Sequence, residues 1–154
     1  APSGEGTDGP LAALALAASI PFSVLVMHRP TANTAKTLEK LTEAAMGTGA
    51  RIALETKGDQ DATPDALVRL IEEELDGVDV GICLDFGRAH ILGDLGEALE
   101  TVSGHLLTTH VHDNAGKKND HLVPYSGTIH WDTAMMETQK IGYDGALKIG
   151  RAHV

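Results

Sequence analysis

The stretch LLTTHVHDNAGKKNDHLVPYSGTIHWD, residues 106–132, begins as an apolar run and ends in a cluster of His, Asp and Asn side chains. His110 and His112 alternate in it, so both imidazoles point to one face if the run is a strand. Asp113 follows at once, where a strand would pass into a loop. Borderline cations such as Zn²⁺ and Mn²⁺ bind this mixture of imidazole and carboxylate. The stretch therefore predicts a metal site at the end of a strand, the alternative being a polar loop with solvated histidines.

Length and composition predict a single globular domain over residues 1–154. The chain is 42% hydrophobic and 22% charged, which separates it from disordered sequences. Its formal net charge is -10. Binding to a phosphate backbone depends on Lys and Arg, so this charge argues against a dedicated nucleic-acid binder. A nuclease with a locally positive site stays compatible with it.

Cys83 is the only cysteine, which excludes an internal disulfide and any CxxC motif. It lies in an apolar run, so we expect a buried, reduced thiol and a cytoplasmic setting. The apolar stretch 11–27 is shorter than a bilayer span and is interrupted by Pro21. Acidic rather than basic residues precede it, unlike a signal peptide. We therefore expect no membrane association.

Short apolar runs alternate along the chain with stretches of helical periodicity, as in parallel βα units. Thr63-Pro64-Asp65 has the composition of a helix start, and Asp132 is expected to cap the last helix. The predicted strands are residues 23–27, 51–54, 78–84, 106–111 and 146–149, and the predicted helices include 11–18, 34–46, 94–102 and 133–141.

Residues of metal-ligand type close four different strands, namely His28, Glu55, Asp85 and the pair His110/His112. In a βα barrel the chemistry gathers at the carboxyl ends of several strands, whereas a doubly wound sheet uses one switch point. No glycine-rich phosphate loop is present. The pattern thus predicts an α/β fold built from parallel βα units of a TIM-type (β/α) barrel. The barrel is incomplete, with about five of its eight strands.

The ordered series VLVMH, IALET, VGICLDFGRAH, THVHDN, HLVP and GYDGALKI resembles the xylose-isomerase-like TIM barrel superfamily over residues 21–149. That superfamily includes sugar and sugar phosphate isomerases and epimerases, and the endonuclease IV type of abasic-site nuclease (AP endonuclease family 2). The resemblance implies that the chain is the C-terminal portion of such a barrel. It is then either a piece of a longer protein or a natural remnant, and it needs a homo-oligomer or the missing N-terminal part of the barrel.

The resemblance implies that Glu55, Asp85 and His110 bind a divalent metal, which could be Mn, Co, Zn or Mg. Glu55 doubles as the acid/base that forms an enediolate in the sugar branch. His112 shares the face of His110 and is the substitute ligand. His121 would contact substrate in the sugar branch.

In the nuclease branch His28 and His121 would also bind metal, and Asn119 stands where an Asp is usual. Arg88 replaces a usual His, and His90 follows it as a candidate that could fold back towards the site. Arg cannot bind a metal in proteins but could contact a phosphate or carboxylate. Gly150 replaces the usual Glu after the last strand, which removes one metal ligand and one base.

Three functions follow from these residues. The first is a metal-dependent sugar (phosphate) isomerase or epimerase acting on a small-molecule sugar or sugar phosphate. The second is a non-catalytic barrel remnant or binding domain, which the departures at Arg88 and Gly150 favour. The third is an endonuclease IV-like phosphodiesterase, to which fewer of the usual ligands remain.

Overall fold

Five parallel strands form one sheet in the order in which they occur in the chain, β1-β2-β3-β4-β5. The computed structural model describes residues 7–17 and 19–149. Each neighbouring pair of strands is parallel and is joined by a helical connection, as predicted for βα units. The elements are α1 (Asp8–Leu16), β1 (Val24–Met27), α2 (Thr34–Ala45), β2 (Arg51–Glu55), α3 (Pro64–Arg69), a π-helical turn η1 (Leu70–Glu74), β3 (Val80–Asp85), α4 (Phe86–Leu92), α5 (Leu95–Val102), β4 (Leu106–Val111), α6 (Trp131–Lys140) and β5 (Leu147–Ile149).

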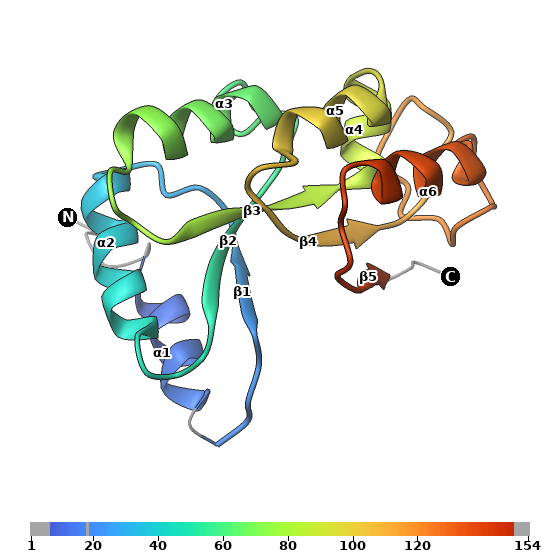
Figure 1. Ribbon diagram of the computed structural model, residues 1–154. Helices are drawn as coiled ribbons and strands as arrows, with labels where there is room; N and C mark the ends of the chain where they lie inside the picture. The colour runs from blue at the N-terminus through green and yellow to red at the C-terminus, as the bar shows by residue number, and fades with distance from the viewer. Residues whose placement is uncertain (1–6, 18, 150–154) are drawn as a thin grey trace.

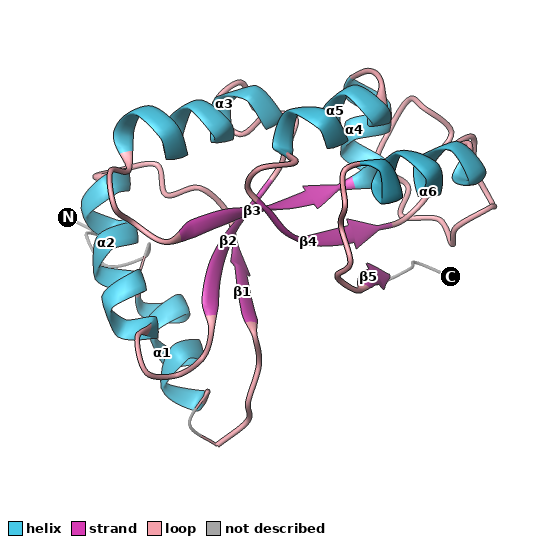
Figure 2. Cartoon of the chain, in the orientation of Figure 1, coloured by secondary structure: helices cyan, strands magenta, loops and turns pink. Residues whose placement is uncertain are grey.

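The sheet curves into a half-barrel whose helices all lie on the outer, convex side (Figure 1). In Figure 2 the strands fan from β1 to β5 with α1 and α2 at one end of the arc and α6 at the other. Sequential strand order has no switch point, so the doubly wound alternative is excluded. The predicted incomplete TIM-type barrel is confirmed. No helix among the described residues is long and apolar enough to cross a membrane.

The hydrophobic core lies between the sheet and its helices. Ile52 and Leu54 of β2 and Ile82 and Leu84 of β3 are fully buried on the helix side. The helices contribute Leu38, Leu41, Leu67 and Leu99. Because side chains alternate along a strand, the residues between them point into the barrel. Cys83 is one of these, a buried free thiol as predicted.

The helix starts are partly as predicted. Thr63 caps α3, since its hydroxyl accepts a hydrogen bond from the Ala66 N–H. Asp132 is not a cap, because α6 begins one residue earlier, at Trp131, and Asp132 lies within its first turn. The first helix begins at Asp8 rather than residue 11, and its expected end at Ala18 lies outside the described residues.

Helix α4 was not predicted. It starts directly after β3, where the Asp85 carboxylate caps it by accepting a hydrogen bond from the Arg88 N–H. No loop separates the two elements, so the sequence shows no break where strand periodicity gives way to helix. The last residue of β3 thereby serves both the sheet and the helix.

Candidate metal centre

The carboxyl ends of β2, β3 and β4 bring Glu55, Asp85 and His110 together. One ligand atom from each of the three side chains lies within 4.8 Å of the others. Asp85 is paired in register with His110, and Glu55 with the neighbouring Cys83. Each of the three residues is at or next to the end of its strand. Parallel pairing thus gathers, at one edge of the sheet, residues that are 55 positions apart in sequence.

Glu55 contacts two imidazoles. Its Oε1 lies 2.6 Å from His110 Nδ1, and its Oε2 lies 3.1 Å from Nε2 of the exposed His28. The hydrogen bond with His110 lowers the pKa of Glu55 and outweighs the opposing effect of burial. The same bond raises the pKa of His110. The pair is therefore held as an ionised carboxylate beside an imidazole that readily takes a proton.

The Glu55, Asp85 and His110 side chains fit a divalent cation chemically. Two carboxylates and one imidazole form the mixed oxygen and nitrogen set that Zn, Mn and Co accept. Two ligands of a tetrahedral ion at about 2.1 Å lie about 3.4 Å apart. The 2.6 Å separation of Glu55 and His110 would need to widen by less than about 1 Å, with loss of the proton between them.

His112 lies behind the three candidate ligands rather than among them. Its side chain is 2% exposed, and its Nε2 is 2.8 Å from Oδ1 of Asp85. Among the described residues this contact is an ion-pair contact, and neither ring nitrogen has a hydrogen-bond partner. The ring packs on Gly87 of α4, where an added Cβ would come within 2.9 Å of Nε2 and closer to two other ring atoms. His112 therefore contacts a candidate ligand and fills the space behind it.

Asp113 is fully buried and accepts hydrogen bonds from four donors. Oδ1 accepts from the N–H groups of Asn114 (2.8 Å) and Ile129 (3.2 Å). Oδ2 accepts from the Gly127 N–H (3.0 Å) and from Nε1 of Trp131 (2.8 Å). Burial alone would raise the pKa of Asp113, but these donors lower it. The carboxylate is thus ionised and occupied, and is not available to a metal.

The loop 114–130 lies against the site and carries two further candidates. The rings of His121 and His112 stack with centroids 4.1 Å apart. Asn119 Nδ2 is 2.8 Å from Nε2 of His121. His121 has a positive φ of 52°, which is uncommon outside glycine. His121 and Asn119 thus form a pair beside His112.

Neither the His90 nor the Arg88 side chain belongs to the group of candidate ligands. His90 bonds Oγ1 of Thr128 at 2.9 Å and does not fold back onto Asp85. The Arg88 backbone N–H donates to the Asp85 carboxylate, whereas its half-buried side chain makes no hydrogen bond or ion pair in the described part of the chain. The Gly150 position lies outside the described residues.

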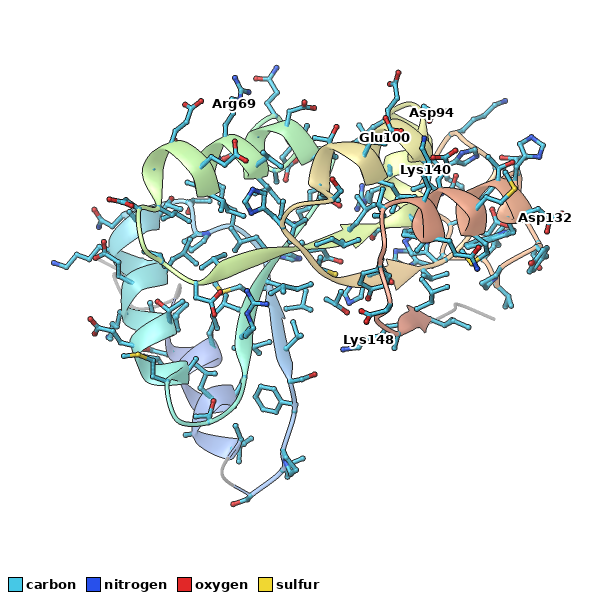
Figure 3. The ribbon with its side chains drawn as sticks, in the orientation of Figure 1. Arg69, Asp94, Glu100, Asp132, Lys140 and Lys148 are labelled. Atoms are coloured by element: carbon cyan, nitrogen blue, oxygen red, sulfur yellow. The ribbon has the colours of Figure 1, made fainter. Side chains whose placement is uncertain are left out.

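Sequence reasoning missed two features of the site. Three of the four donors to Asp113 lie 14 to 18 residues further on in the sequence, so no local pattern predicts them. Lys148 of β5, labelled in Figure 3, is paired in register with His110, and its positive charge acts to lower the pKa of that imidazole. Only the strand pairing identifies Lys148 as a neighbour of the site.

Comparison with known proteins gives one family match. A family model described as xylose isomerase-like TIM barrel matches residues 28–151. The uncharacterized protein MJ1311 of Methanocaldococcus jannaschii is 29% identical over 129 residues, which are 79% of this chain and 44% of that protein. The chain therefore spans less than half the length of this relative.

Solved structures show the same fold. The crystal structure of a D-tagatose 3-epimerase-like protein matches with a TM-score of 0.77 and 27% identity, covering 90% of this chain and 59% of that one. The crystal structure of the IOLI protein with a binding zinc atom matches with a TM-score of 0.69 and 19% identity, covering 92% and 58%. Both matched proteins are larger than this chain and contain its half-barrel as a part.

Proposed function

Because the chain belongs to the xylose isomerase-like TIM barrel family, we propose that it is the metal-binding portion of a sugar isomerase or epimerase. The observation that carries the proposal is the convergence of Glu55, Asp85 and His110 within 4.8 Å at the ends of three strands. The similar structures of an epimerase-like protein and of a zinc-binding protein support the same reading.

In this proposal Glu55, Asp85 and His110 hold a divalent cation, which would polarise the substrate oxygens and stabilise negative charge next to the abstracted proton. Glu55 takes that proton from the carbon beside a carbonyl. Its lowered pKa keeps it ionised and able to accept. His28, 3.1 Å from Glu55 Oε2 and 62% exposed, lies where it can exchange a proton between Glu55 and solvent.

The substrate class is a small sugar or sugar phosphate. Arg88 is a half-buried guanidinium without an ion-pair partner in the described residues, and Lys148 lies beside His110. Either cation suits an anionic group on the substrate, such as a phosphate or a carboxylate. Gly150 offers no second base. Glu55 is then the one base that we assign among the described residues, so we favour proton transfer on a single face of the substrate.

The test is proton exchange in D₂O, followed by NMR, with a panel of ketoses and their phosphates. Mn²⁺, Co²⁺, Zn²⁺ and Mg²⁺ are supplied in turn. We expect deuterium at the carbon beside the carbonyl with the wild-type chain, and its loss in Glu55→Gln. Glu72→Gln is the matched control, since Glu72 is an exposed acid that also contacts a histidine, His105. Absence of exchange with every metal would contradict the enzymatic proposal. If the chain binds metal but catalyses no proton exchange, the remaining function is that of a non-catalytic binding domain.

A further inference from the structure

One residue, Asp113, attaches both the middle and the returning end of loop 114–130 to the half-barrel. The backbone of Asp113 exchanges two hydrogen bonds of 2.8 Å with Leu122, at the middle of the loop. Its carboxylate accepts from Gly127, Ile129 and Trp131, where the loop returns to α6. Asp113 itself follows β4 by two residues. A single buried aspartate thus ties the outgoing and returning parts of the loop to the strand that carries His110.

We propose that Asp113 is a positioning residue for the candidate metal centre: its carboxylate holds loop 114–130 so that His121 stacks on His112, which in turn packs against Asp85. The functional part of this inference rests on the proposed function, because that proposal makes Asp85 a metal ligand. The tie between Asp113 and the loop is independent of any metal.

The loop backbone approaches the Asp113 carboxylate closely at Gly127. A Cβ at Gly127 would come within 2.7 Å of the Asn114 backbone and collide with the Asp113 carboxylate, so only glycine allows the approach. Asn114 adds a second attachment, since its Nδ2 donates to the Gly87 carbonyl oxygen of α4 at 2.8 Å. The Thr128 N–H donates a hydrogen bond of 2.9 Å to the backbone carbonyl oxygen of Asn114.

The contacts lead from the loop to a candidate ligand in two steps. His121 stacks on His112 at 4.1 Å, with the ring planes 24° apart. His112 Nε2 lies 2.8 Å from Asp85 Oδ1, the same oxygen that accepts from the Arg88 N–H. If the loop lifts, His112 loses the ring that covers it. The Asp85 carboxylate then loses a fixed neighbour on one side.

Asp113→Asn tests the inference. The asparagine keeps one oxygen, but in either orientation its NH₂ group faces two of the four N–H donors, which then repel it. The matched control is Asp94→Asn, because Asp94 also accepts a backbone N–H, from Glu97 at the start of α5, but makes no hydrogen bond to loop 114–130 among the described residues. Trp131→Phe removes one donor only, and it serves as the second variant if Asp113→Asn does not fold.

Three readouts separate the loop from the rest of the fold. The first is the rate of trypsin cleavage under native conditions after Lys117 and Lys118, which are exposed on the loop. Mass spectrometry identifies the cleavage sites. The second is the NMR signal of the His112 and His121 rings, whose mutual stacking shifts their protons. The third is Mn²⁺ affinity by calorimetry.

For Asp113→Asn we expect at least tenfold faster cleavage in the loop, loss of the ring shifts and at least fivefold weaker Mn²⁺ binding. Asp94→Asn should change none of the three. Cleavage no faster than in Asp94→Asn would overturn the tie to the loop. Faster cleavage with unchanged ring signals would overturn the positioning role. If the wild-type chain binds no metal, the proposed function fails, whereas cleavage and ring signals still decide the inference.

Discussion

Replacing Gly87 by alanine tests whether His112 is packed as tightly as the structure indicates. Gly87 lies in the first turn of α4, under the His112 ring, and an added Cβ would come within 2.9 Å of Nε2 and nearer to two other ring atoms. Non-bonded heavy atoms prefer about 3.5–4.0 Å, so the ring must move by roughly 1 Å or more. Overpacking of this kind costs about 1–3 kcal/mol.

Alanine also favours a helix over glycine by about 1 kcal/mol, which offsets part of the cost. Because the overlap with the ring is large, we take the upper part of that cost range, about 2–3 kcal/mol, and the net expectation for Gly87→Ala is a loss of about 1–2 kcal/mol in the free energy of unfolding. In a domain of this size that lowers Tm by roughly 2–8 °C. Urea and thermal unfolding followed by the fluorescence of Trp131, the single tryptophan, measure both quantities.

Gly9→Ala is the matched control, because Gly9 lies in helix α1 and an added Cβ there meets nothing within 4 Å. This variant should be as stable as the wild type or slightly more stable. If Gly87→Ala unfolds at the same urea concentration as Gly9→Ala, the His112 ring is not packed on Gly87 as described. The Asp85 carboxylate would then have no tightly packed imidazole behind it.

Three further predictions concern other parts of the molecule. The raised pKa of His110 makes its pair with Glu55 stabilising below the ordinary imidazole pKa of 6.5, and the lowered pKa of Glu55 makes the pair stabilising above the ordinary carboxyl pKa of 4.5. The free energy of unfolding lost in His110→Gln, measured by urea titration, should therefore be greatest between pH 4.5 and 6.5. A loss that does not vary with pH would contradict the pair. Burial, followed by the charges of Glu55 and Asp85, raises the pKa of Cys83 to about 12. Ellman's reagent should therefore label the thiol only as fast as the chain unfolds. Rapid labelling of the folded protein would contradict the buried position of Cys83. Strand β5 exposes Leu147 and Ile149 and has no strand on its outer side among the described residues. Light scattering should therefore detect concentration-dependent self-association of this chain. A monomer at high concentration would refute this prediction.

The strands and the residues that close them could be predicted from sequence because both are local properties. Apolar runs of strand length stop at Glu55 and Asp85, and parallel pairing then brings their ends together without further information. The capping role of Asp85 was missed, because α4 begins with no intervening loop. Asp113 was predicted to lie where strand 106–111 passes into a loop, and no partner was assigned to it. Its actual partners, Gly127 and Trp131, become neighbours only when the loop folds back.

The sequential order of the strands has a consequence for how the chain acquires its structure. Every strand bonds only to the strands next to it in sequence, so each new βα unit can add to the edge left by the one before. Such nearest-neighbour growth keeps loop-closure entropy low and suits folding from the N-terminus during synthesis. The Glu55–His110 pair spans 55 residues and can form only after β4 has joined the sheet. The group of candidate ligands therefore assembles late in folding, when β4 joins a sheet that already has three strands.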